Sequence, residues 1–310
     1  MTQFVDLRDE RLSATVKGAA LEKMCTAASW GEGPVWLESQ ACLLWSDIPN
    51  NRMLVWSEDE GVRVWASEVE FTNGHYLDLN GDLLHCSHGL RGIYRTPLSM
   101  GQLRADTPMA CVVDRFDGLR LNSPNDVVVK RDGTIWFTDP PYGIHSDREG
   151  HQAESEIGLN GVYRFDPSTQ RLDRVTDWMD EPNGLAFSPD EKTLYVSDTS
   201  AALRAPGQGY HHIVAFDVVD GRAIANPRLF AVIDPGLPDG LRIDKQGFIY
   251  TSSEDSVQVL HPDGTLMGKL YVPEKVGNLT FGGRHGNELY VVASTSLYRI
   301  CLNTQGTQPT

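Results

Sequence analysis

The chain has 310 residues and a formal net charge of −15, with 27 Lys and Arg against 42 Asp and Glu. This charge argues against nucleic acid and anionic membrane surfaces as partners. The longest apolar runs have the length of strands, and residues 1–18 lack a signal-peptide pattern, so neither a membrane span nor secretion is expected.

One sequence pattern recurs along the chain at intervals of roughly 40 to 60 residues. In each copy, a short turn carrying Glu, Asn or Asp leads into an apolar strand, a second turn and a second strand. The residues that open the six copies are Glu32, Asn73, Asn125, Asn183, Asp239 and Asn278. Repeats of this size, built from short strands, predict an all-β fold: a six-bladed β-propeller with one four-stranded blade per repeat.

Within the copies, apolar runs flank residues that are typical of hairpin turns. Residues 127–129 and 135–137, for example, are separated by a turn that contains Asp132-Gly133. Glycine accepts the positive φ that such turns need. No segment shows clean helical periodicity, so helices should be few and short. Third strands of blades are predicted over residues 161–165, 213–216 and 256–260.

A ring of blades has to close, because unpaired first and last sheets would expose edge strands. We predict that residues before Glu32 pair with the last blade. The repeats continue without a low-complexity break, so residues 1–310 are expected to form a single β-propeller domain. Two longer polar insertions, residues 143–160 and 200–212, are expected to cover one mouth of the channel.

The five cysteines are odd in number and scattered, and none forms a Cys-x-x-Cys pair. Structural disulfides are therefore not expected, which fits a reducing compartment. We expect a cytoplasmic protein.

Residues at the same point of each repeat lie on one ring around a propeller axis. All-oxygen ligands on that ring favour Ca²⁺, Mg²⁺ or Mn²⁺, and Zn²⁺ also accepts carboxylate oxygen. A single Asn-Gly or Asp-Gly pair is an ordinary turn, so the prediction depends on the recurrence. We predict that a metal site in the central channel is formed by Glu32, Asn125, Asn183 and Asp239.

Segments 31–36, 120–144 and 181–198 resemble the SMP-30/gluconolactonase/luciferin-regenerating enzyme family of calcium-dependent six-bladed propellers. The resemblance covers nearly the whole chain, and the last two segments are similar to bacterial gluconolactonases. It implies hydrolysis of a sugar lactone with one divalent cation, Ca²⁺ first, and no organic cofactor. Animal members place a substrate-binding Arg where this chain has Ser123, with its own Arg at Arg120, so that contact is not matched. The family's metal ligands fall on Glu32, Asn125, Asn183 and Asp239.

Catalytic roles are expected for two of these ligands. Asp239 is expected either to activate a water as general base or only to tune the metal, and Asn125 to hold the substrate oxygen. For substrate hydroxyls we predict His88, Arg120 and Tyr142, which lie in loops near the mouths of repeats. His88 and Tyr142 each have a plainer alternative, as a hydrogen-bonded histidine and as a packed loop aromatic.

Three functions are open at this point. The first is metal-dependent hydrolysis of an aldonolactone such as glucono-1,5-lactone, and the second is hydrolysis of another ester or an organophosphate on the same architecture. The third is a non-catalytic binding propeller with a structural metal. The nucleophile elbow, zinc-protease and nucleotide-binding motifs are absent from the sequence. The expected partner is a small-molecule sugar lactone, and no residue pattern indicates an oligomeric state.

Overall fold

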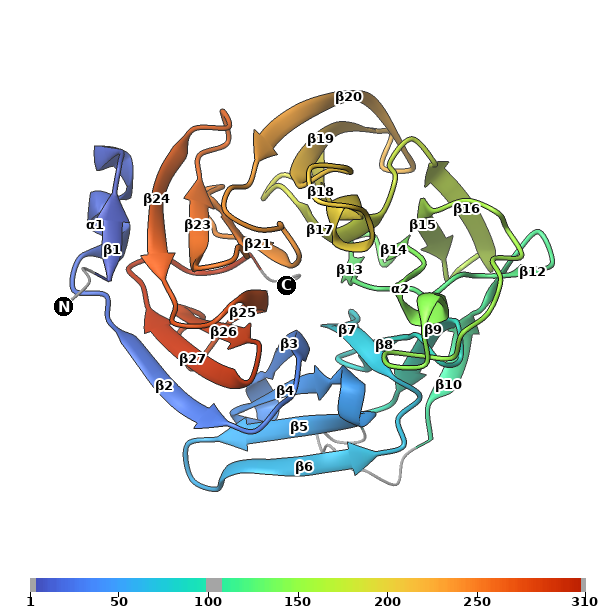
Figure 1. Cartoon of the computed structure of the whole chain (residues 1–310), viewed down its shortest axis with the longest axis horizontal. Coiled ribbons are helices and arrows are strands. Elements are labelled where there is room, and N and C mark those ends of the chain that lie inside the picture. Colours follow the sequence, from blue (N-terminus) through green and yellow to red (C-terminus); the bar gives the residue numbers. More distant parts are fainter. Residues whose placement is uncertain (1–3, 99–107, 308–310) are drawn as a thin grey trace.

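The computed structural model describes residues 4–98 and 108–307 of the chain. Its strands form six blades arranged in a ring around a central axis (Figure 1). The all-β, six-bladed propeller predicted from the repeats is therefore confirmed. Helices are short: the α-helices of the described residues are α1 (Ser13–Val16) and α2 (Tyr142–His145). None of the described helices has the length and apolar character needed to cross a membrane.

Each blade runs from an inner strand beside the axis to an outer strand at the rim (Figure 1). The first two blades are β3 (Gly31–Leu37), β4 (Cys42–Asp47), β5 (Arg52–Ser57), β6 (Gly61–Ser67) and β7 (Thr72–Leu77), β8 (Leu83–Ser87), β9 (Gly92–Thr96), β10 (Ala110–Val113). The next two are β13 (Val127–Val129), β14 (Ile135–Asp139), β15 (Gly161–Asp166), β16 (Arg171–Thr176) and β17 (Pro182–Phe187), β18 (Thr193–Asp198), β19 (His212–Val219), β20 (Ala223–Val232). The fifth contains β21 (Leu241–Ile243), β22 (Ile249–Thr251), β23 (Ser256–Leu260) and β24 (Leu266–Tyr271), and the sixth contains β25 (Val276–Gly282), β26 (Glu288–Ala293) and β27 (Ser296–Cys301). A two-stranded hairpin of β11 (Arg115–Phe116) and β12 (Leu119–Arg120) precedes the third blade.

The N-terminal part of the chain supplies outer strands to the last two blades. β2 (Leu21–Thr26) pairs antiparallel with β27 and is the fourth strand of the sixth blade. β1 (Val5–Leu7) pairs with β24 and adds a fifth strand to the fifth blade. The sixth blade therefore combines both ends of the sequence, which joins the first and last parts of the ring.

The hydrophobic core lies between neighbouring blades, so the middle strands are buried on both faces. Trp136 of β14, for example, is fully buried with Leu185 and Val196 of the next blade. Burying a large apolar side chain contributes roughly 1.5–3 kcal/mol. Between the first and last blades, the rings of Trp36 and Tyr290 stack with centroids 5.3 Å apart. This contact packs the last blade against the first.

Candidate active site

The six residues that open the repeats stand at or just before the innermost strands. Around the axis, β3 contacts β7, β7 contacts β13, β13 contacts β17, β17 contacts β21, β21 contacts β25, and β25 contacts β3. The circuit is closed, so the N-terminal ends of these strands surround one end of the channel (Figure 1). We call this the ring end; its residues are Glu32, Asn73, Asn125, Asn183, Asp239 and Asn278.

Glycines that follow the ring residues allow neighbouring blades to approach closely. Gly33 has φ +55°, and a Cβ there would lie 1.9 Å from the carbonyl oxygen of Asn73 in the next blade. A Cβ on Gly184 would lie 2.3 Å from the carbonyl oxygen of Asp239. Any larger residue would push two ring residues apart. The Glu-Gly and Asn-Gly pairs seen in the sequence are thus explained by packing around the axis.

Hydrogen bonds from one blade to the next hold the backbone of the ring. The Thr138 hydroxyl of β14 donates to the Asn183 carbonyl at 2.6 Å. The Ser197 hydroxyl of β18 donates to the Asp239 carbonyl at 2.9 Å. The side chains at the ring end are therefore carried by a backbone that is fixed on both sides.

Glu32 is buried, with 3% of its surface exposed. Its Oε2 accepts hydrogen bonds from Gly33 N at 3.2 Å and from Asn278 Nδ2 at 3.1 Å. Its Oε1 is buried and has no hydrogen-bond partner among the described residues. Burial, and then the charge of Asp239, raise the pKa of Glu32 well above its usual value. An oxygen that is buried and unpaired in this way is available to a ligand.

Asp239 is the second carboxylate of the ring end. Burial raises its pKa from 3.8 to about 7, and the charge of Lys275 and a hydrogen bond with Asn183 act in the opposite direction. Its backbone N donates to the Ser252 hydroxyl at 2.7 Å. The structure thus brings Glu32, Asn183 and Asp239 close together at the ring end.

Asn73 and His88 form a polar pair in the second blade, next around the ring from Glu32. His88 Nδ1 donates to the Glu149 carbonyl at 2.8 Å, so its Nε2 accepts from Asn73 Nδ2 at 3.3 Å. Burial lowers the His88 pKa to about 4, which keeps the imidazole neutral. Asn73 Oδ1 is then left buried without a partner among the described residues. Sequence analysis placed Asn73 on the ring but left it out of the metal set; the only signal for it was its position in the repeat.

Tyr142 begins α2, beside the fourth blade's ring residue. Its hydroxyl is hydrogen-bonded to the Thr199 hydroxyl, which also accepts from Asn183 Nδ2 at 3.0 Å. Burial, and then the charge of Glu181, raise the Tyr142 pKa well above its usual value. Glu181 itself is 6% exposed, with Oε2 unpaired in the described structure, and burial raises its pKa to about 7. Sequence analysis did not identify Glu181, because its contact with Tyr142 of another blade forms only in the folded chain.

The other two predicted residues differ in their environment. Asn125 is 5% exposed, and its carbonyl accepts from Gly74 N at 2.8 Å, which places it on the ring. Arg120 is half-buried, and its Nη2 donates to the Leu90 carbonyl at 3.0 Å. Within the described residues, no hydrogen bond of Arg120 reaches the ring end. The structure therefore brings Asn125, but not Arg120, to the ring.

The sequence and the fold of this chain are both similar to those of known proteins. Residues 30–295 match the family model described as the SMP-30/Gluconolactonase/LRE-like region. The chain belongs to the SMP-30/gluconolactonase/LRE-like family. This family member is 32% identical to a gluconolactonase of Zymomonas mobilis, over 92% of this chain and 82% of that protein. It is 27% identical to a pentonolactonase of Haloferax volcanii, over 87% and 83% of the two chains. A solved gluconolactonase of Xanthomonas campestris superimposes with a TM-score of 0.87 at 40% identity, over 97% of this chain and 95% of that chain.

The ring end of this family member suits a hard cation. Across residues 4–98 and 108–307, no three His, Cys, Asp or Glu side chains are grouped as metal ligands. The metal set predicted from the sequence differs from such a group, because two of its four members are Asn and bind through amide oxygens. Two oxygens here, Glu32 Oε1 and Asn73 Oδ1, are buried and unpaired in the described structure. Hard divalent cations bind carboxylate and amide oxygens of this type, so the residues present fit such an ion.

Proposed function

We propose that this protein hydrolyses a sugar lactone, an aldonolactone such as D-glucono-1,5-lactone, to the open sugar acid. Family membership and the similarity to proteins named as gluconolactonases and a pentonolactonase support this proposal. The observation that carries it is the pair of buried carboxylates at the ring end, with Glu32 Oε1 unpaired and the pKa values of both groups raised. Such perturbed carboxylates are typical of catalytic and metal-binding sites.

The residues that would hold a divalent cation are Glu32, Asn125, Asn183 and Asp239. Ca²⁺ is the first choice, because the donors are all oxygen; Mg²⁺, Mn²⁺ and Zn²⁺ are alternatives. When bound, a divalent cation supplies Lewis acidity that polarises a carbonyl oxygen. No organic cofactor is part of the proposal.

The protein's own groups have distinct tasks in this proposal. Asp239 accepts a proton from the attacking water, a role that suits a carboxylate whose pKa burial raises. Asn125 holds the lactone oxygen with its side-chain amide. His88 has both ring nitrogens engaged, so it orients the Asn73 amide and does not titrate near neutral pH.

The hydroxyl groups of the sugar would meet the polar side of the ring end. The Tyr142 hydroxyl shares its Thr199 partner with Asn183, and Glu181 Oε2 lacks a partner in the described part of the chain. A carboxylate and a phenol are the acceptor and donor that a polyhydroxylated ring can use. An unsubstituted lactone would leave these groups unpaired, which costs about 1–3 kcal/mol per buried group.

The compartment is also part of the proposal. All five cysteines are free, and two of them, Cys42 and Cys86, are buried. Free thiols fit a reducing compartment, so we propose a cytoplasmic location.

The test is initial-rate hydrolysis, followed by proton release and corrected for the spontaneous reaction. D-glucono-1,5-lactone and D-xylono-1,4-lactone are compared with δ-valerolactone, which has no hydroxyl groups, and with an organophosphate ester, paraoxon. We expect the sugar lactones to have the larger kcat/KM, and Asp239→Asn to lower it by about 10²-fold or more. Glu60→Gln, which removes the same charge from an exposed turn, should leave the rate unchanged. Preference for paraoxon or δ-valerolactone would overturn the choice of substrate.

A further inference from the structure

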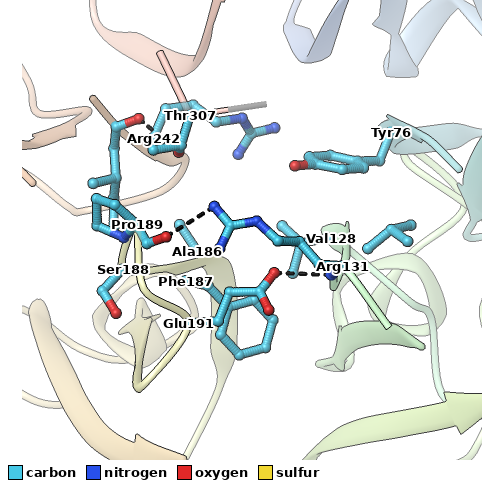
Figure 2. Close-up of a pocket in the computed structure, with 12 residues that line it drawn as sticks. Tyr76, Val128, Arg131, Ala186, Phe187, Ser188, Pro189, Glu191, Arg242 and Thr307 are labelled. Atoms are coloured by element: carbon cyan, nitrogen blue, oxygen red, sulfur yellow. Dashed lines mark hydrogen bonds between the residues drawn. The ribbon is translucent and has the colours of Figure 1, made fainter. Parts of the chain in front are cut away.

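A cavity lies at the end of the channel opposite the ring end. It has a volume of about 50 Å³ and lies where β7, β13, β17 and β21 reach their C-terminal ends (Figure 2). Its polar lining residues include Tyr76, Arg131, Glu191, Arg242 and Thr307. Since one water needs only about 10–15 Å³ of such space, the cavity has room for a small polyatomic ion. We call it the rear cavity.

Arg242 presents an unpaired cationic donor to the rear cavity. Its side chain is 10% exposed, and Nη1 donates to Asp126 Oδ2 at 3.3 Å and to the Leu241 carbonyl at 2.8 Å. Its Nη2 is buried and has no hydrogen-bond partner among the described residues. A guanidinium carries only donors, so this nitrogen needs an acceptor, and leaving it without one is unfavourable.

Two further donors approach the same space. Figure 2 shows the Tyr76 hydroxyl directed toward the Arg242 guanidinium. Burial raises the Tyr76 pKa to about 12, so the phenol keeps its proton at neutral pH. The Arg131 side chain extends along the cavity, where its Nη2 donates to the Pro189 carbonyl at 2.9 Å (Figure 2). No other side-chain nitrogen of Arg131 makes a hydrogen bond within the described residues.

The carboxylates near the rear cavity are already paired. Asp126 is bound by Arg242, and Glu191 accepts from Lys130 Nζ at 3.1 Å and from Arg131 N at 2.8 Å. Three cationic side chains, Lys130, Arg131 and Arg242, therefore face three carboxylates, since Asp132 also pairs with Lys130 at 3.4 Å. Each of these carboxylates already has a cationic partner and none of them accepts from Arg242 Nη2, so this donor is left for another acceptor.

We propose that the rear cavity binds one small oxyanion, of the size of inorganic phosphate, between Arg242, Arg131 and Tyr76. The planar fork of a guanidinium matches two oxygens of one oxyanion, and the phenol supplies a further donor. The bound ion satisfies Arg242 Nη2 and is separate from the ring end. The proposal does not depend on the lactonase activity.

The test is calorimetric titration of the full chain with sodium phosphate at constant ionic strength, with sodium chloride as the comparison. The informative variants are Tyr76→Phe and Arg131→Gln, because both leave the Asp126–Arg242 ion pair in place. The matched control is Arg63→Gln, which removes one positive charge from an exposed strand. Melting temperatures of all four proteins verify that they are folded.

We expect phosphate to bind at one site per chain. Arg131→Gln should weaken binding by about tenfold or more and Tyr76→Phe by about three- to tenfold, while Arg63→Gln leaves it unchanged. Two results would overturn the proposal. One is the absence of saturable binding to the folded wild-type protein, and the other is equal binding by the two cavity variants and the control, which would place the ion elsewhere.

Discussion

Asp239→Asn removes a carboxylate whose charged form is disfavoured by burial, and so should change the stability of the folded protein when no cation is bound. Burial raises the Asp239 pKa from 3.8 to about 7, so the native state holds this proton more tightly than the unfolded chain. The resulting stabilisation is complete below about pH 4 and is lost as the pH rises through about 7. A shift of roughly three pKa units, at about 1.4 kcal/mol each, gives an upper limit of about 4 kcal/mol. At pH 8 without cation, Asp239→Asn should therefore raise the free energy of unfolding by about 1–4 kcal/mol.

The assay is urea denaturation with chelator present, at pH 5 and at pH 8. The variant should have a higher free energy of unfolding than the wild type at pH 8. At pH 5 the two should differ little, because the wild-type carboxyl is protonated at that pH. Glu60→Gln, at a side chain 66% exposed, should show neither effect. Adding Ca²⁺ at pH 8 should stabilise the wild type more than the variant, because the proposed cation site would lose one charged ligand. The reasoning is refuted if the variant is less stable than the wild type at pH 8 without cation, or if Ca²⁺ stabilises both equally.

Three further variants test other parts of the structure. Gly33→Ala should destabilise the protein by about 3 kcal/mol or more, because its Cβ would lie 1.9 Å from a backbone oxygen. Gly61→Ala, at φ +68° in open space, should cost only about 1 kcal/mol by urea denaturation, and equal losses would contradict the packing argument. Tyr142→Phe should raise KM for D-glucono-1,5-lactone about three- to tenfold in steady-state kinetics, whereas an unchanged KM would remove Tyr142 from the substrate contacts. Glu181→Gln should raise the free energy of unfolding at pH 8 by up to about 3 kcal/mol, since burial raises the Glu181 pKa from 4.5 to about 7; a loss of stability would contradict this.

The fold was predictable because each repeat contains residues that favour the turns between its strands. The hairpin at Asp132-Gly133 forms as expected, with Gly133 at φ +84° and its N donating to the Lys130 carbonyl at 2.8 Å. The third strands expected over 161–165, 213–216 and 256–260 correspond to β15, β19 and β23. The pairing of β1 with β24 was not predicted, because a three-residue strand has no periodicity to detect.

At the ring end, sequence analysis could identify only the residues that are marked by their position in the repeat. That logic places Glu32, Asn183 and Asp239 together, but it does not distinguish Asn73, whose free oxygen depends on the contact with His88. Arg120 belongs to the short hairpin before the third blade, and its direction depends on the Leu90 carbonyl of the second blade. Contacts between repeats of this kind have no signature in local sequence.

The most direct test of the account measures turnover against cation occupancy in the same samples. Chelator-treated protein is titrated with Ca²⁺, calorimetry gives the fraction of sites filled, and proton release gives the rate with D-glucono-1,5-lactone. We predict that the rate rises in proportion to the filling of one site, and that Glu32→Gln stays inactive at Ca²⁺ concentrations that saturate the wild type. Full turnover by folded, chelator-treated protein, or a filled site with no turnover, would contradict the account.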